Sequence, residues 1–182
     1  IRPFSVYRKN ITIMGDSAGM ELDEWRASGS TLFTLLSGVE IETHPLDPIR
    51  STYGVHIIDS TVTIVNFNFV GMHTREGALS VKNSEIHVRD CRFIRNTTAG
   101  STADRGAAIQ FDSPGLWNKS TVVSCEFDSN RSRGNGGAVS VSGGWIEIAD
   151  STFDGNEAIK GGAVYFEGGQ GELVDCEIRW NN

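Results

Sequence analysis

The sequence predicts an all-β fold, a right-handed parallel β-helix in which about six short rungs stack into a solenoid. Three observations lead to this prediction. Two motifs alternate along the chain at intervals of roughly 24 to 30 residues. Apolar residues between them follow a period of two, and Asn, Asp or Ser recurs between the apolar bursts. Strands this short bury their apolar faces only when neighbouring repeats stack.

The first motif is a glycine-alanine segment that opens each repeat. Its best copies are Gly136-Gly137-Ala138-Val139 and Gly161-Gly162-Ala163-Val164, preceded by Gly106-Ala107-Ala108-Ile109. Weaker copies at Gly77-Ala78-Leu79 and Tyr53-Gly54-Val55 extend the series toward the N-terminus. Apolar residues alternate directly after each copy, which predicts a short strand there.

The second motif lies about 15 to 19 residues after the first. It combines a small residue, a large apolar residue two positions later and, in most repeats, an Asn three positions after that. We predict that each position forms a column of stacked side chains, and that the Asn amides bond from rung to rung at a corner. The columns are Cys91, Cys125, Ser151 and Cys176; Phe93, Phe127, Phe153 and Ile178; and Asn96, Asn130, Asn156 and Asn181.

A further column of turn-forming residues predicts a sharp corner between two strands of each rung. Asn and Asp tolerate the left-handed backbone that such a corner requires. This column consists of Asn66, Asp90, Ser124, Asp150 and Asp175.

The first fifty residues follow the repeat less closely than residues 51–182. Strands are expected at 10–15, 31–35 and 39–41, and the polar segment 16–30 is expected to be a side loop, a cap or a joint between subunits. We predict one β-helix domain over 1–182. Because Trp180-Asn181-Asn182 follows the last motif directly, we also expect a longer chain, or head-to-tail stacking of subunits into a filament.

The pairing of Phe-x-x-Asn with Gly-Gly-Ala-Val resembles the repeats of chlamydial polymorphic outer-membrane proteins and of similar surface proteins in algae and other protists. The best copy is Phe153-Asp154-Gly155-Asn156 followed by Gly161-Gly162-Ala163-Val164. The first rungs resemble pectin-lyase-like proteins more generally. The resemblance covers about residues 54 to 182 and implies a β-helix on a cell surface, used as an adhesin, a passenger or a structural rod. Met72 in place of Asn, and Glu76 in place of Gly, depart from the pattern.

Pectin-lyase-like proteins also include enzymes, which by this resemblance place carboxylates with Arg or His on one outer face. Here Asp90, Asp150 and Asp175 fall in the corner column, where a turn role accounts for them. Asp59, Glu147 and Glu167 remain candidates for a shared outer face. The alternation predicts outward side chains for His56 and His87. His44 and His73 are expected in loops, so the four histidines form no evident cluster. We predict no catalytic residue, metal site or cofactor.

The cysteines allow two readings. Cys91, Cys125 and Cys176 behave either as small buried apolar residues in one column, or Cys91 and Cys125 form a bridge between neighbouring rungs, which the roughly 4.8 Å strand spacing permits. The side-chain torsion of two parallel stacked cysteines favours the reduced column. The sequence has no Cys-x-x-Cys pair, the spacing that would indicate a zinc site.

Four N-glycosylation sequons favour a secreted eukaryotic glycoprotein, with acceptors at Asn10, Asn96, Asn118 and Asn130. Stacking of Asn96 and Asn130 in the corner conflicts with a glycan there, whereas Asn118 lies in an insertion and is the best acceptor. We therefore expect an extracellular or cell-surface location.

A net charge of −7 without a basic stripe argues against nucleic acid as a partner, and no apolar run is long enough for a membrane helix. Two functions remain. The first is a non-catalytic structural or adhesive module whose partners are other subunits or further rungs. The second is a carbohydrate-active enzyme or polysaccharide-binding module.

Overall fold

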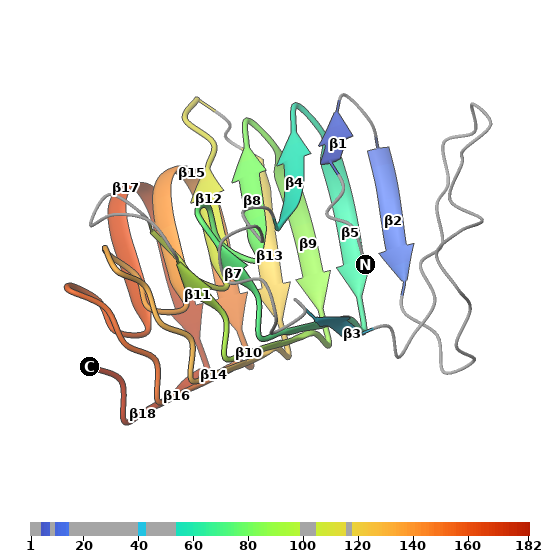
Figure 1. The fold of residues 1–182 in the computed structure, drawn as a ribbon. Helices are drawn as coiled ribbons and strands as arrows, with labels where there is room; N and C mark the ends of the chain where they lie inside the picture. The colour runs from blue at the N-terminus through green and yellow to red at the C-terminus, as the bar shows by residue number, and fades with distance from the viewer. Residues whose placement is uncertain (1–4, 8–9, 15–39, 43–53, 99–104, 116–117) are drawn as a thin grey trace.

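The computed structural model describes residues 5–7, 10–14, 40–42, 54–98, 105–115 and 118–182. Throughout these residues the secondary structure consists of β-strands, turns and bends, without a helix. Every strand pairs with its neighbours in parallel, and Figure 1 shows the rungs succeeding one another along the solenoid from the N-terminal to the C-terminal end. The predicted strand at 31–35, the polar segment 16–30 and His44 lie outside the described residues.

Each rung contributes three main strands, which form three rows. The first row contains β1 (Ser5–Tyr7), β4 (Val55–Ile58), β8 (Leu79–Lys82), β12 (Ile109–Asp112) and the first parts of β15 (Val139–Ala149) and β17 (Val164–Val174). The second row contains β2 (Asn10–Met14), β5 (Thr61–Val65), β9 (Glu85–Arg89), β13 (Lys119–Val123) and the later parts of β15 and β17. Because β15 and β17 run through both rows, the two rows form one ten-stranded sheet.

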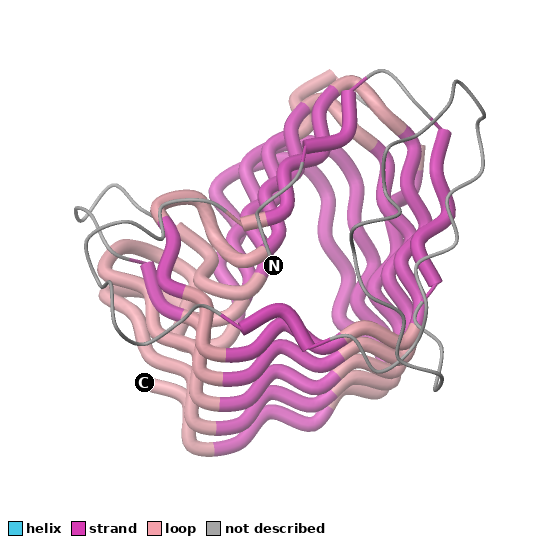
Figure 2. The backbone as a smooth tube through the Cα atoms, turned by 45° about the vertical axis from the view of Figure 1, so that its right-hand side comes forward, coloured by secondary structure: helices cyan, strands magenta, loops and turns pink. Residues whose placement is uncertain are grey.

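The third row is a separate six-stranded sheet. It contains β3 (Glu40–Glu42), β6 (Asn68–Val70), β10 (Arg92–Ile94), β14 (Glu126–Asp128), β16 (Thr152–Asp154) and β18 (Glu177–Arg179). A small third sheet pairs β7 (His73–Thr74) with β11 (Thr97–Thr98). Viewed along the coil, the rows enclose a common interior (Figure 2).

The described residues form a parallel β-solenoid of about five turns, with β1, β2 and β3 adding a strand to each row at the N-terminal side. About six rungs were predicted. Two of the three strands predicted in the first fifty residues are present as β2 and β3, whereas β1 was not predicted.

The interior is filled by the inward residue of each alternating pair. Phe93 and Phe127 are both 0% exposed, and they face each other in the parallel register of β10 and β14. The ring centroids of Phe69, Phe93, Phe127 and Phe153 follow one another at 4.6, 5.0 and 4.6 Å, with nearly parallel planes. The next position in this column, Ile178, is 50% exposed.

The predicted corner column adopts the left-handed backbone. The φ angles of Asn66, Asp90, Ser124, Asp150 and Asp175 lie between 49° and 56°. The Asn column differs in detail, because the left-handed residue of that corner precedes each Asn, as in Arg95 before Asn96 and Ser129 before Asn130.

Close backbone packing explains why the first motif contains glycine. A Cβ on Gly137 would lie 1.9 Å from the carbonyl oxygen of Gly162 in the next rung and 2.8 Å from the amide nitrogen of Glu157. A side chain does not fit at this distance. The glycine-alanine segment can therefore lie directly against the next rung only when this position is a glycine.

Candidate functional site

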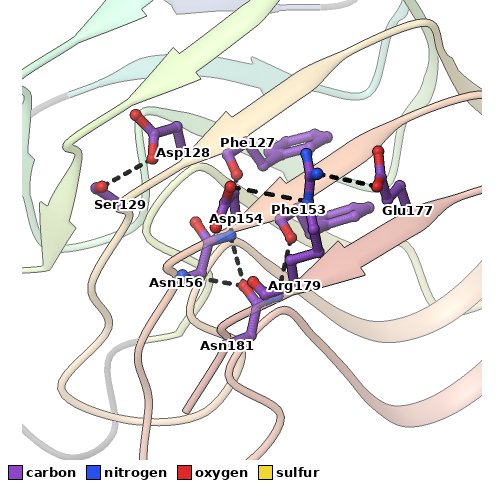
Figure 3. A network of polar contacts seen from close by, with 9 residues as sticks. All are labelled: Phe127, Asp128, Ser129, Phe153, Asp154, Asn156, Glu177, Arg179 and Asn181. Atoms are coloured by element: carbon purple, nitrogen blue, oxygen red, sulfur yellow. Dashed lines mark hydrogen bonds and ion pairs between the residues drawn. The ribbon is translucent and has the colours of Figure 1, made fainter.

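The Asn column forms a continuous ladder of buried amides. Asn130 donates from Nδ2 to Asn156 Oδ1 and to the Phe93 carbonyl, both at 2.9 Å, and its Oδ1 accepts from Nδ2 of Asn96 at 2.9 Å. The same pattern continues from Asn156 to Asn181 (Figure 3). Asn96, Asn130 and Asn156 are 0% exposed. These amides therefore hold neighbouring rungs together.

This ladder bears on the four predicted glycosylation sites. Nδ2 of Asn96, like that of Asn130, is buried and donates two hydrogen bonds, so a glycan on either would break the ladder. Asn118 is exposed, and its Nδ2 donates only to Glu85 Oε2 at 3.0 Å. Asn10 opens β2 and pairs with Thr61. Glycosylation at Asn118 and Asn10 stays a prediction.

The cysteine column lies beside the phenylalanine stack. Cys91 and Cys125 are buried, Cys176 is partly exposed, and all three are free. Ser151 occupies the position between the last two, where its Oγ accepts from the Cys125 amide at 3.0 Å. Hydrogen bonding to Cys91, reinforced by burial, raises the pKa of the Cys125 thiol.

The outer side of the second row carries two neighbouring sets of interacting polar side chains outside the ladders. We call them together the second-row cluster. His87 bonds to Glu85 Oε1 at 3.1 Å and to Thr121 Oγ1 at 3.0 Å. Lys119 forms an ion pair with Glu147, and its Nζ lies 5.5 Å from the centre of the Trp145 ring. The cluster consists of Glu85, His87, Lys119, Thr121, Trp145 and Glu147, all partly exposed.

The cluster brings together residues from three rungs, because β9, β13 and β15 are neighbours in the second row. Each carboxylate has a basic neighbour, Glu85 beside His87 and Glu147 beside Lys119. The three acids proposed to share an outer face do not meet in one cluster. Asp59 follows β4 at a left-handed position, and Glu167 forms an ion pair with Arg105.

A second, smaller group covers the outer side of the first row near β4 and β8. Glu76 Oε2 accepts from Lys82 Nζ at 2.8 Å and from Ser80 Oγ at 3.3 Å, and lies 3.6 Å from His56 Nδ1. Burial lowers the pKa of His56 more than the charge of Glu76 raises it. Burial opposes ionisation of Glu76, but the hydrogen bond and charge of Lys82 bring its pKa below the usual value.

The outer side of the third row carries ion pairs between rungs. Arg92 Nε lies 2.7 Å from Glu126 Oε2, and Arg179 bridges Glu177 and Asp154 at 3.1 and 3.9 Å (Figure 3). Across the described residues, no group of three His, Cys, Asp or Glu side chains is placed to hold a metal ion. No helix in this part of the chain is long and apolar enough to cross a membrane.

Comparison with known families agrees with this geometry. The sequence model described as "Right handed beta helix region" matches residues 9–182. The chain belongs to this β-helix family. No curated protein and no solved structure matches it. Membership of the β-helix family accounts for the right-handed coil. The function of this chain depends on its own side chains.

Within this β-helix the sequence reasoning missed a second polar ladder, at the corner between the first and second rows. Ser84 Oγ accepts from the Ser60 amide at 3.0 Å, and Ser113 Oγ accepts from the Ser84 amide at 3.0 Å. All three serines are buried. The available signal was a serine one or two residues after the first-row strands β4, β8 and β12. His73, predicted in a loop, lies in β7, with Nδ1 2.6 Å from Thr97 Oγ1.

Proposed function

We propose that this β-helix is a non-catalytic structural or adhesive module of an extracellular or cell-surface assembly. The observation that carries the proposal is that its polar side chains bond to other groups of the same coil. The buried amides and hydroxyls of the corners bond to neighbouring rungs, and three outward acids of the second and third rows, Glu85, Glu126 and Glu147, have basic partners. Such an arrangement stiffens a rod and presents a patterned surface.

The pKa pattern supports the same proposal. Active sites usually concentrate strongly perturbed titratable groups in a cleft. In this chain, the Cys91–Cys125 pair with shifted pKa values is buried in the core. Of the shifted outer groups, Glu76 accepts hydrogen bonds from Lys82 and Ser80, and His56 Nδ1 lies 3.6 Å from Glu76 Oε2.

The surface location rests on the sequons and on the resemblance of the repeats to those of chlamydial and protist surface proteins. Asn118 supports it best, because its side chain is exposed. An extracellular module of this kind has other subunits or further rungs as partners, and head-to-tail stacking would continue each parallel row in the same direction.

The proposal is tested by assaying the purified chain for turnover and for attachment in parallel. Neutral and acidic polysaccharides are incubated with the protein, and new reducing ends and unsaturated uronates are measured. We expect no product, and we expect the immobilised protein to retain cells or matrix polymers. Product formation that disappears in Glu147→Gln but persists in Glu177→Gln, a matched change on the third row, would contradict a non-catalytic role.

A second candidate function, polysaccharide binding, is favoured by the second-row cluster. Trp145 offers an aromatic surface beside Lys119, and Glu85, His87 and Glu147 add hydrogen-bonding groups on the outer side of the same row. This candidate predicts retardation of the chain in gels that contain the bound polysaccharide. Trp145→Ala should remove the retardation, and Thr152→Ala, on the outer side of the third row, should keep it. Equal mobility of all three proteins in every gel would reject this candidate.

A further inference from the structure

Cys91 and Cys125 are direct neighbours across two rungs. The residues that follow them, Arg92 and Glu126, are partners in the parallel register of β10 and β14. The Glu126 amide donates to the Cys91 carbonyl at 2.9 Å, which ties the two chain segments together at the cysteines. Neighbouring strands lie about 4.8 Å apart, which falls within the Cα separation of roughly 4.4 to 6.8 Å found for disulfides.

The third cysteine is separated from this pair. Ser151 occupies the rung between Cys125 and Cys176, and its Oγ bonds to the Cys125 amide at 3.0 Å and to the Ala149 carbonyl at 2.7 Å. Cys176 is therefore two rungs away from Cys125, about twice the strand spacing. Among the three thiols, the column leaves a single neighbouring pair.

The two thiols also interact with each other. The hydrogen bond between them lowers the pKa of Cys91, while the same contact and burial raise the pKa of Cys125. Each sulfur also lies near a carbonyl two residues earlier in its own rung, Arg89 O at 3.2 Å for Cys91 and Val123 O at 3.3 Å for Cys125. Cys91 is thus the better thiolate, with a thiol donor beside it. A thiolate is the attacking species in thiol–disulfide exchange.

We propose that Cys91 and Cys125 are an oxidisable pair that closes into a disulfide between neighbouring rungs. The oxidant is a small disulfide such as oxidised glutathione. The Cys91 thiolate attacks one of its sulfurs, which releases one glutathione thiolate and leaves a mixed disulfide. Cys125 then loses its proton and attacks Cys91 Sγ, releasing the second glutathione. Two protein thiols become one disulfide, and the oxidant is reduced to two thiols.

Burial decides when this reaction occurs. Both sulfurs are in the core, so the oxidant reaches them before the rungs close or when they open. Closing the bridge requires the stacked side chains to rotate and give up their contacts with the Arg89 and Val123 carbonyls. A bridge formed at such a cost is more readily reduced than an unstrained one. The pair therefore acts as a redox-dependent staple between the second and third complete rungs.

The experiment refolds the chain in oxidised and reduced glutathione, in parallel with a fully reduced sample. Thiols are alkylated after denaturation, and the bridge is mapped by peptide mass. We expect the free thiols to fall from three to the single thiol of Cys176. The melting temperature should rise by about 5–10 °C and return to the reduced value with a reductant, because the bridge closes a loop of roughly 34 residues.

Serine variants separate the pair from general oxidation. Cys176→Ser should keep the bridge and the temperature shift, whereas Cys125→Ser should lose both. Ser151 shows that serine fits this column. Three free thiols after oxidative refolding, or a mapped bridge that includes Cys176, would overturn the proposal. The mapping uses the unaltered chain, so it decides the question even where a variant fails to fold.

Discussion

The two sides of the third row use the same rung spacing with different consequences. On the inner side, Phe127 and Asn130 are 0% exposed and contact equivalent residues above and below. On the outer side, Arg92 and Glu126 also meet across neighbouring rungs, but their side chains are 53% and 42% exposed. Both pairs repeat in register because the strands are parallel.

The difference shows that stacking in register does not by itself determine how much a column of side chains contributes to stability. Inside, each contact removes apolar area or polar groups from water, and an amide left without its partner has no solvent to replace it. Outside, water and salt compensate for a lost ion pair. The inner columns therefore hold the coil together, and the outer columns contribute less to its stability.

Among these substitutions, Phe127→Ala should have the largest effect on stability. The substitution opens a cavity between Phe93 and Phe153, whose rings pack against both faces of Phe127. We expect a loss of about 3–5 kcal/mol in the free energy of unfolding, measured by urea denaturation. A loss below about 1 kcal/mol would mean that the stack contributes no more than a surface contact. Phe127→Leu, which keeps most of the volume, serves as the control.

Asn130→Ala is expected to rank second. It leaves the Asn96 amide group without its acceptor and the Phe93 carbonyl without a donor, both in the core. We expect a loss on the order of 3 kcal/mol. Asn118→Ala removes an exposed amide and should change stability by less than about 0.5 kcal/mol. Similar losses at both positions would remove the distinction between ladder and surface asparagines.

Acidification tests a partly buried position between these extremes. The folded pKa of His56 is lowered chiefly by burial, so the unfolded chain binds its proton first as pH falls. Stability at this site is complete above the unfolded value of 6.5 and declines as pH falls from there toward the folded pKa. Glu76 loses its contribution only below its own unfolded value of 4.5.

The wild-type chain should therefore lose more stability than His56→Gln between pH 7.5 and 5.5, as measured by urea midpoints across this range. All other ionisable groups are the same in both proteins, so the difference between the two curves isolates His56. An identical pH dependence would show that burial does not disfavour the charged imidazole.

Arg92→Ala should have the smallest effect. The exposed pair with Glu126 is expected to contribute about 0–1 kcal/mol, and this contribution should shrink in high salt. A double-mutant cycle with Glu126→Gln, run in low and high salt, measures the coupling. A salt-independent coupling near 3 kcal/mol would place this outer pair in the same class as the buried ladder.

Much of the fold could be predicted because inward positions tolerate few alternatives. The interval between Phe93 and Phe127 includes an insertion, yet both residues occupy the same register position. A shift by one residue would turn every inward side chain of the strand to the solvent. The left-handed corner at Asp90 and Asp150 followed equally well from residue type.

The outer clusters were not predictable in the same way. Lys119 and Glu147 come from different rungs and meet through long, flexible side chains. Glu147 was expected on an outer face, but alternation did not show which neighbour its side chain would contact. In the sequence, Asp59, Glu147 and Glu167 were equally good candidates for a shared outer face. Only the folded coil shows that they lie apart. The buried serines were missed because serine also suits an ordinary turn.

The sequence by itself determined the solenoid, its inward columns and the residues at its sharp corners, because burial and backbone sterics act on residue type and spacing. The tertiary structure alone decided that Ser60, Ser84 and Ser113 form a ladder and that Glu85, His87, Lys119, Trp145 and Glu147 gather on one face. These contacts depend on which rung lies beside which, and that is set by the stacking of the whole coil.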